Sequence, residues 1–339
     1  MKLLIRATNW VGDAIMALPA LRVVRSRFSD AQITILARSY VAAIYKHQKV
    51  CDNMMLVDDK GDLVSELRVQ KFDAALLLQN SFHAAWLAWR AGIPQRIGYA
   101  RDGRGLLLTK SLPAPKSGEI PLHEQYYYLE LLRRAGWLDA LPEETFIKLE
   151  VHEQDRRRAE EFLLSAGSNP THLRIAIGAG ASYGSAKCWP PDRFAGLANH
   201  LQADPKVEII LFGTSAEAPV SSAIAAGMQR PPIDLTGKTS IADLSALLSQ
   251  CQLFVGNDSG AMHVASGVGL PVVAVFGPTD PFGTAPVTPR CTIVQERPYC
   301  SPCFLRRCPT DHRCMTSIAP AAVESAARRW ISSAEVSSA

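Results

Sequence analysis

The amino-acid sequence predicts an α/β protein built from two doubly wound lobes. Short apolar runs alternate with segments of helical spacing, this alternation restarts near mid-chain, and glycine-rich or polar turns follow several predicted strands. Alternating βα units favour parallel sheets with helices on both faces. The length of 339 residues also exceeds that of a typical single domain, which favours two.

In the first half of the chain, strands and helices are expected in alternation from the N-terminus. Residues 2–6 predict a buried strand, and the apolar spacing over 13–28 predicts the helix that follows it. Residues 93–121 are rich in Gly, Arg and Pro and predict a looser segment. The other expected strands cover 32–36, 53–57 and 73–78, and the other helices cover 40–47, 63–70 and 122–135.

The second half repeats this pattern after a boundary expected between residues 138 and 170. An amphipathic helix over 153–166 leads into a strand at 173–177. Further strands are expected at 207–212, 233–235, 253–255 and 272–276, and a last helix at 319–331. We therefore expect an N-terminal Rossmann-like lobe at 1–160, a C-terminal Rossmann-like lobe at 161–318, and a segment at 319–339 that packs back across the first lobe. Ligands of such folds bind at the carboxyl ends of the strands, here around one central cleft.

Composition excludes several classes of protein. The net charge is +4, from 36 basic and 32 acidic residues without a lysine-rich tail, which predicts no nucleic-acid binding but suits an acidic substrate or an anionic membrane surface. No apolar run approaches the roughly 20 residues of a membrane span, and the N-terminus does not resemble a secretory signal. We expect a cytoplasmic protein.

The first predicted turn, residues 7–13, places a glycine and a carboxylate at the start of a helix. Gly12 would let a ligand approach the backbone closely. Asp13 has two interpretations that position alone leaves equally weighted, a helix cap or a general base on a cleft-facing loop.

The second lobe carries two further candidate segments. Residues 178–184 form a glycine-rich turn that includes Ser182, and Lys187 follows it, where its ammonium could reach a diphosphate. Residues 256–263 leave a strand and enter a helix, with Asp258 and Ser259 able to cap it. The Ser259 and Gly260 amides and His263 could face the same ligand. A dehydrogenase fingerprint is disfavoured because the next strand ends in Gly213-Thr214 instead of an acidic residue, and Pro232 excludes a P-loop at Gly237.

Together these strings resemble the ADP-heptose:lipopolysaccharide heptosyltransferases of glycosyltransferase family 9. The resemblance rests on four motifs and covers nearly the whole chain, and residues 79–82, 92–94 and 96–98 are most similar to the heptosyltransferase II branch. The motifs are Asn9-Trp10-Val11-Gly12-Asp13, Ala186-Lys187-Cys188-Trp189-Pro190, Phe212-Gly213 with Glu217, and Asn257-Asp258-Ser259-Gly260 with His263.

The resemblance implies a GT-B fold and a metal-independent, inverting transfer of heptose from ADP-L-glycero-D-manno-heptose to the heptosylated Kdo2-lipid A inner core. It implies an acceptor-binding first lobe and an ADP-sugar-binding second lobe, at the inner face of the inner membrane. Asp13 would be the base, and Lys187 would bind the diphosphate. The implied donor contacts are Gly12, Ser182, Lys187, Glu217, Asp258, Ser259, Gly260 and His263.

Candidate acceptor contacts lie in the first lobe. Asn9 belongs to the first motif, and Arg101 and Arg104 could bind an acceptor phosphate or a Kdo carboxylate, although ordinary solvated arginines are an equal alternative. Heptosyltransferase I, another ADP-heptose-using family 9 transferase, or a catalytically silent sugar-nucleotide binding protein remain alternative functions.

Four of the eight cysteines cluster near the C-terminus: Cys300, Cys303, Cys308 and Cys314. Their spacing could surround a structural zinc or an iron–sulfur centre, while uncommitted thiols or disulfides are the alternatives. No catalysis is assigned to them, and no cofactor is expected to be required for transfer.

Overall fold

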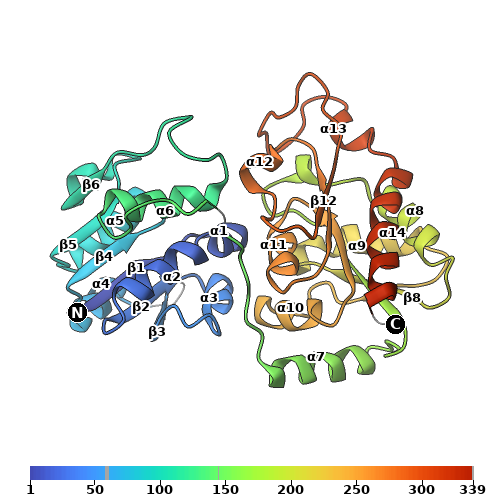
Figure 1. The fold of residues 1–339 in the computed structure, drawn as a ribbon, viewed down its shortest axis with the longest axis horizontal. Coiled ribbons are helices and arrows are strands. Elements are labelled where there is room, and N and C mark those ends of the chain that lie inside the picture. The colour runs from blue at the N-terminus through green and yellow to red at the C-terminus, as the bar shows by residue number, and fades with distance from the viewer. Residues whose placement is uncertain (58–60, 144, 338–339) are drawn as a thin grey trace. The chain divides into compact units, whose positions relative to one another are not determined.

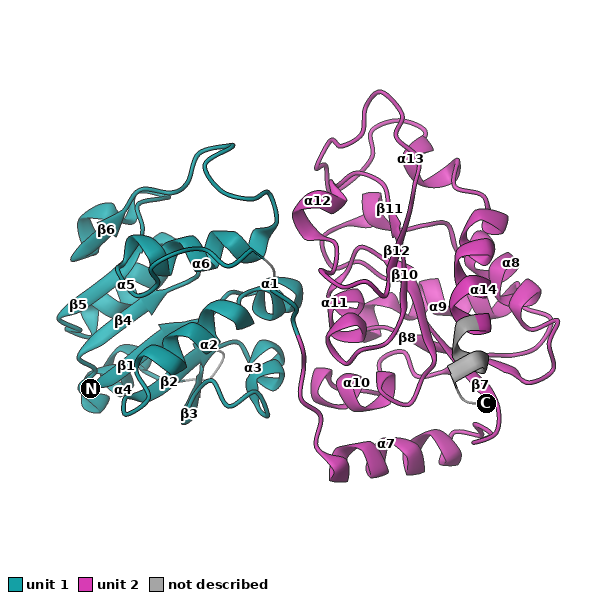
Figure 2. Cartoon of the chain, viewed as in Figure 1, with its two compact units in different colours: residues 1–147 teal, residues 148–339 magenta. Residues whose placement is uncertain are grey.

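The computed structural model describes residues 1–57, 61–143 and 145–337, and the chain divides into two compact units, Met1–Ile147 and Lys148–Ala339 (Figure 2). The division lies within the interval 138–170 in which the boundary is expected, but before residue 160, the expected end of the first lobe. Helix α7 (Glu153–Ser165) packs on α10 (Ile241–Leu248), and the Leu149 amide donates to the Gly267 carbonyl at 2.7 Å, which ties both segments to the second unit.

Unit 1 is built on a six-stranded parallel sheet in the order β3-β2-β1-β4-β5-β6 (Figure 1). The central strand β1 pairs with β2 on one side and β4 on the other, so the chain winds outward twice from β1. The strands are β1 (Lys2–Arg6), β2 (Gln32–Ala37), β3 (Asn53–Leu56), β4 (Ala74–Leu77), β5 (Gln95–Tyr99) and β6 (Lys110–Leu112). Both faces of β1 and β4 are buried, as a parallel sheet covered by helices requires.

The helix expected over 13–28 is two helices, α1 (Val11–Met16) and α2 (Leu18–Arg27). Pro19 in the first turn of α2 has no amide hydrogen to continue the ladder of α1, so the helix breaks at Ala17. The other helices of unit 1 are α3 (Ser39–Tyr45), α4 (Leu63–Gln70), α5 (Phe82–Arg90) and α6 (Glu124–Arg134), with the 3₁₀ turn η1 (Arg104–Leu107).

Unit 2 repeats the same winding in the order β12-β11-β10-β7-β8-β9. Its strands are β7 (Leu173–Gly178), β8 (Val207–Phe212), β9 (Ile233–Asp234), β10 (Leu253–Asn257), β11 (Val272–Phe276) and β12 (Cys291–Gln295). The chain runs from β7 out to β9 and then returns to β10, on the other side of β7, which is the topological switch point where doubly wound folds bind ligands.

The helices of unit 2 cover its sheet, and the last one belongs to the core. Helix α14 (Pro320–Ser337) buries Val323, Ala326 and Ala327 among residues of α8 and the central strands. Helix α14 therefore belongs to the core of unit 2, whereas residues 319–339 were expected to be a segment separate from the second lobe. The remaining helices are α8 (Pro191–Leu201), α9 (Ala218–Ala226), α11 (Gly260–Gly267), α12 (Pro281–Thr284) and α13 (Arg313–Thr316), with η2 (Ser185–Lys187) and η3 (Ser215–Glu217).

Among the described residues, no helix is long and apolar enough to cross a membrane.

Candidate functional site

In unit 2 the predicted donor residues follow the carboxyl ends of β7, β8 and β10. These three strands are neighbours in the sheet, so the loops that follow them emerge side by side at the switch point. Asn257, at the end of β10, is fully buried and connects two of them. Its Oδ1 accepts from the Trp189 amide at 3.0 Å, and its Nδ2 donates to the Ala179 carbonyl at 2.6 Å.

Lys187 and Asp258 form a largely buried ion pair at this place. The Lys187 Nζ lies 2.5 Å from the Asp258 Oδ2, and the side chains are only 11% and 5% exposed. Thr279, in the loop after β11, donates its hydroxyl to the same carboxylate oxygen at 2.7 Å. Lys187 is therefore no ordinary surface lysine. The expectation that Asp258 caps α11 is wrong, because its carboxylate is committed to Lys187 and Thr279.

The N-terminus of α11 has the features of an anion site. Ser259 is the N-cap residue, but its hydroxyl makes no capping bond, and among the described residues this buried oxygen has no hydrogen-bond partner. The predicted side-chain cap is therefore absent there, and the hydroxyl is left for a ligand. The first amides of the helix, including that of Gly260, have no intrahelical acceptor and carry the positive end of the dipole. His263 is buried one turn further along α11.

Glu217 lies against the glycine-rich turn after β7. Its Oε2 accepts from the Thr214 amide at 2.7 Å and hydroxyl at 3.0 Å, which fixes the carboxylate at the first turn after β8. A Cβ at Gly180 would lie 1.8 Å from the Glu217 Oε1, so only glycine admits this contact. Ser182, further along the same turn, is exposed.

In unit 1, Asp13 lies on the first turn of α1, partly buried. The N-cap of α1 is Trp10, so Asp13 is not the capping residue. Asn9 precedes this turn and is held by two neighbours. Its Oδ1 accepts from the buried Arg6 Nη2 at 2.9 Å, and its carbonyl accepts from the Tyr40 hydroxyl at 2.7 Å. The side chain of Arg6, at the end of β1, therefore helps to hold in place the segment that carries Asn9, Gly12 and Asp13.

The structure adds Glu124, which the sequence analysis did not identify as a site residue. Glu124 opens α6, which packs on α1. The pKa of Glu124 is raised to about 7, chiefly by burial and also by the Asp13 carboxylate, against the opposing effect of Arg101. Two carboxylates from two helices therefore interact in this unit. The signal available in the sequence was an acidic residue at a predicted helix start, but its burial came only with the fold.

Of the two predicted acceptor arginines, Arg101 is exposed and Arg104 is not. Arg104 is fully buried. Its Nε donates to the Tyr99 carbonyl at 2.8 Å and its Nη2 to the Asn80 Oδ1 at 2.7 Å. The predicted role of Arg104 in binding an acceptor anion is therefore wrong, because its guanidinium is buried and joins the loop after β5 to the loop after β4. Asn80 in turn donates to the Tyr127 hydroxyl at 2.6 Å, and Arg101 also bonds that hydroxyl.

The four clustered cysteines carry free thiols in the segment between β12 and α14. Burial, together with the three other thiols of the cluster, raises the pKa of Cys314 to about 11. Within the described chain, no three His, Cys, Asp or Glu side chains are grouped so as to hold a metal ion. The arrangement thus does not fit a preformed zinc or iron–sulfur site, and metal content stays a prediction for analysis of the purified protein.

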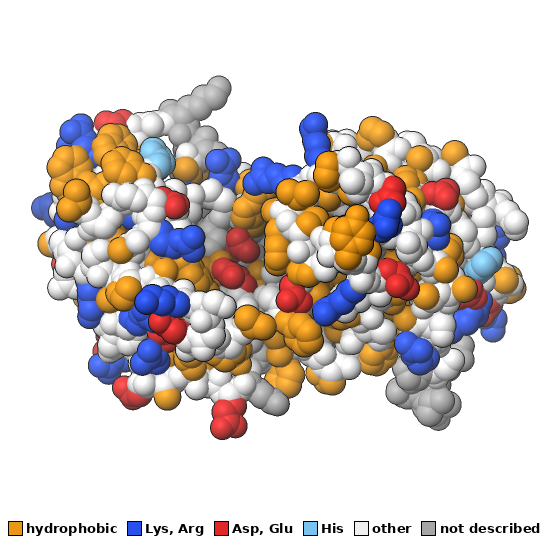
Figure 3. Space-filling model, turned by 90° about the horizontal axis from the view of Figure 1, so that it is seen from above, with side chains coloured by type: hydrophobic (Ala, Val, Ile, Leu, Met, Phe, Trp, Pro, Cys, Tyr) orange, Lys and Arg blue, Asp and Glu red, His pale blue; other side chains and the backbone are white. Residues whose placement is uncertain are grey.

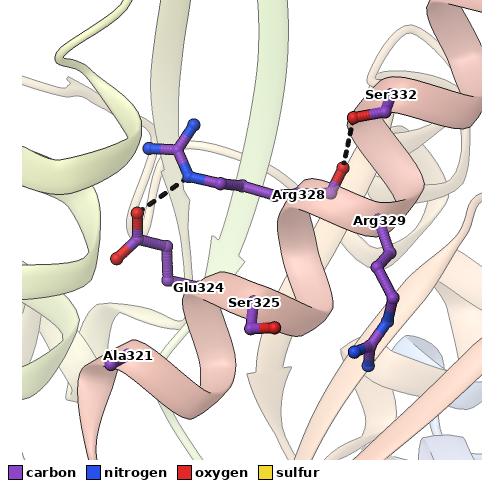
Figure 4. A pocket seen from close by; sticks show the side chains of 6 residues that line it. All are labelled: Ala321, Glu324, Ser325, Arg328, Arg329 and Ser332. Carbon is purple, nitrogen blue, oxygen red and sulfur yellow. Dashed lines mark hydrogen bonds and ion pairs between the residues drawn. The ribbon is translucent and has the colours of Figure 1, made fainter.

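A surface pocket elsewhere on unit 2 contains none of these groups. It runs along one face of α14 and is lined by Ala321, Glu324, Ser325, Arg328, Arg329 and Ser332 (Figure 4). The Arg328 Nε donates to Glu324 at 2.8 Å, and the Ser332 hydroxyl to the Arg328 carbonyl at 3.0 Å. We interpret it as a solvated helix face.

Comparison with known proteins identifies the family and the fold of the chain. A model of glycosyltransferase family 9 (heptosyltransferase) matches residues 61–313. The chain is 28% identical over 314 residues to lipopolysaccharide heptosyltransferase 2 of Escherichia coli strain K12, covering 87% of this chain and 88% of the relative. It is 27% identical to a lipooligosaccharide heptosyltransferase 2 of Campylobacter jejuni, covering 94% and 95%. The solved structure of E. coli ADP-heptose LPS heptosyltransferase II matches with a TM-score of 0.84 at 25% identity, covering 99% and 100%. The predicted α/β fold class of two doubly wound lobes is confirmed.

Proposed function

Because the chain belongs to glycosyltransferase family 9, we propose that it transfers heptose from ADP-L-glycero-D-manno-heptose to the heptosylated Kdo2-lipid A inner core of lipopolysaccharide. The observation that carries the donor half of this proposal is the buried pair of Lys187 and Asp258 beside the unpartnered Ser259 hydroxyl. A cation, a free hydroxyl and a helix N-terminus at one switch point are what a nucleoside diphosphate requires.

In the donor site, Lys187 binds the diphosphate through ammonium protons that Asp258 does not accept. Asp258 and Thr279 hold the lysine in place. The Ser259 hydroxyl and the Ser259 and Gly260 amides donate to the phosphate oxygens, while Glu217 accepts from donor hydroxyls. Gly12, Ser182 and His263 complete the proposed donor contacts.

In the acceptor site, Asn9 and Arg101 bind the inner core, and Asp13 is the general base. Asp13 takes the proton from the acceptor hydroxyl as that oxygen attacks the anomeric carbon of the donor heptose. The bond from this carbon to the diphosphate oxygen breaks on the opposite face, which inverts the configuration. ADP leaves with the electron pair, and the new charge is stabilised by Lys187 and the α11 amides.

We further propose that the protein contacts the inner face of the inner membrane through α5 and η1, which pack together. Phe82, Trp89 and Leu106 are 51%, 48% and 98% exposed. The Arg90 guanidinium stacks over the Trp86 ring at 5.8 Å, which adds a cation to this aromatic face. Figure 3 shows hydrophobic side chains gathered on unit 1, at left, with basic side chains beside them. Aromatic rings flanked by arginine suit the interface of an anionic bilayer.

Sedimentation with vesicles tests this membrane contact. The double variant Trp89→Ser, Leu106→Ser should bind vesicles containing anionic lipid more weakly than the native protein. The variant Phe162→Ser, which removes an exposed aromatic of α7, should bind as the native protein does. Equal binding by all three proteins would contradict the proposed surface.

The enzymatic proposal is tested by ADP release from ADP-heptose with two acceptors, Kdo2-lipid A carrying no heptose and Kdo2-lipid A carrying one. Release with the heptosylated acceptor alone supports the proposal. Release with the acceptor that lacks heptose would indicate heptosyltransferase I activity. Donor binding without turnover on either acceptor would indicate a sugar-nucleotide binding protein.

A further inference from the structure

The segment between β12 and α13, which contains three of the clustered cysteines, lies directly over the donor site. The Phe304 amide donates to the Pro278 carbonyl at 2.8 Å, in the loop after β11. The Tyr183 hydroxyl donates to the Phe304 carbonyl at 2.6 Å, and the Ala186 amide donates to the Arg306 carbonyl at 3.1 Å. The loops after β7 and β11 are therefore both bonded to this segment.

The approach of the two backbones is unusually close at Gly184. A Cβ at this position would lie 2.2 Å from the Arg306 carbonyl oxygen, a distance that no side chain could tolerate. His312 adds a second attachment, because its Nε2 lies 2.7 Å from the Ala186 carbonyl. The position of Arg306 relative to the donor loop is thus set by backbone contacts and does not depend on its own side chain.

The Tyr183 ring brings two cations together. The Lys187 Nζ lies 4.8 Å from the ring centroid, and the Arg306 Cζ lies 5.4 Å from it. Cations approach an aromatic face because of its negative quadrupole. A cation from a distant part of the chain is therefore held at the same aromatic ring as the lysine that binds the diphosphate in the proposed mechanism.

The balance of charge makes this second cation important. Asp258 neutralises Lys187 at 2.5 Å, so the pair as a whole brings no net charge to the site. Arg306 is exposed, and the described part of the chain places no carboxylate within ion-pair distance of it. A diphosphate that carries more than one negative charge would find in Arg306 a cation whose charge is not already compensated, with a fork of donors that suits phosphate oxygens.

We propose that Arg306 is a second diphosphate-binding residue, presented by the cysteine-flanked segment beside Lys187. This inference rests on the proposed function, since it takes the ligand to be the diphosphate of a nucleoside diphosphate sugar. Lys187 then orients the diphosphate, and Arg306 supplies the net positive charge that the departing ADP requires.

The chain offers a matched control in Arg307. This residue is also exposed, has the same charge and lies in the same segment, but it is not one of the cations at the Tyr183 ring. Calorimetry with ADP and with adenosine should be performed on the native protein, Arg306→Ala and Arg307→Ala. Arg306→Ala should weaken ADP binding by about 10- to 100-fold and leave adenosine binding unchanged, whereas Arg307→Ala should change neither by more than about twofold.

Equal weakening by the two substitutions would overturn the inference, because the effect would then come from general charge. Native ADP affinity in Arg306→Ala would also overturn it, while leaving the proposed function intact. Failure of the native protein to bind ADP would overturn the proposed function and the inference with it. Thermal melting checks that each variant is folded. If Arg306→Ala melts at a lower temperature than the native protein, Arg306→Gln provides the same comparison with more of the side chain retained.

Discussion

At the scale of single residues, Asp13 and Lys187 have environments that match distinct parts of one transfer reaction. Asp13 is a partly buried carboxylate on the first turn of α1 and does not cap the helix. Lys187 is a buried cation fixed by Asp258. A base should act on the acceptor and a cation on the leaving group, so substitutions at these positions should separate turnover from donor binding.

The substitution Asp13→Asn should lower the transfer rate by about 100-fold or more, the range expected for loss of a general base. ADP affinity should stay at its native value, because no donor-phosphate contact is removed. Steady-state ADP release and calorimetry measure the two quantities. Asp30→Asn, an exposed change in the same unit, is the control, and native turnover in Asp13→Asn would exclude a base role.

Glu124 should make stability depend on pH. Folding raises its pKa from 4.5 to about 7, so between these values the folded protein holds the proton more tightly than the unfolded chain. Stability is therefore lost as the pH rises from about 4.5 to about 7, by at most about 3 kcal/mol, and this loss persists at higher pH.

Glu124→Gln removes this titration. Its free energy of unfolding relative to that of the native protein should therefore increase between pH 4 and pH 8, as measured by urea denaturation. Glu161→Gln, an exposed change on α7, should show no such pH trend. A difference between Glu124→Gln and the native protein that is constant with pH would contradict the assigned role of burial.

At the scale of elements, the sequence predicted most of the strands, including the edge strands β3 and β9, but missed β5, β6 and β12, of which β5 and β6 lie in the segment 93–121 that was expected to be looser. Strand β4 is wholly apolar, and β1 and β7 are mostly apolar, because helices cover both faces of a parallel sheet. Strands β6 and β12 lie at sheet edges, are only partly buried, and therefore lack that signal.

The candidate site shows the same division between local and long-range information. Helix-terminal residues such as Ser259 follow from local motifs. The pairing of Lys187 with Asp258 joins segments 71 residues apart, and the role of Arg104 depends on its burial. Neither property has a local sequence signature, which is why the lysine's partner was not anticipated and the arginine was misassigned.

The contact between the donor loop and the cysteine-flanked segment should be sensitive at Gly184. In Gly184→Ala the new Cβ would meet the Arg306 carbonyl, so the two segments must separate. We expect a loss of roughly 1–3 kcal/mol in the free energy of unfolding, as for other overpacked sites, together with weaker ADP binding.

Gly196→Ala is expected to have the opposite effect on the free energy of unfolding. Gly196 lies inside α8, and a Cβ there would meet its nearest neighbour at an ordinary 3.9 Å. Alanine should therefore stabilise the protein by about 0.5–1 kcal/mol through its helix propensity. If both glycine substitutions destabilised the protein equally, the close approach at Gly184 would not explain its effect.

At the scale of the whole molecule, each unit has its own sheet and its own buried core. All the proposed donor contacts except Gly12 lie in unit 2, whereas the base and the acceptor contacts lie in unit 1. The division at Ile147 follows the contacts of α7, so a fragment that begins at Lys148 keeps that helix together with its partner α10.

We therefore expect residues 148–339, expressed alone, to bind ADP with an affinity within about threefold of the intact chain, a difference of under about 1 kcal/mol. The same fragment should release no ADP from ADP-heptose in the presence of acceptor, since Asp13 is missing. Calorimetry and the release assay measure the two properties, and circular dichroism establishes that the fragment is folded. Adding Arg306→Ala to the fragment should weaken ADP binding as much as it does in the intact chain, because both cations belong to unit 2. A folded fragment without ADP affinity would show that unit 1 contributes to the diphosphate site, and the assignment of the donor to unit 2 would fail.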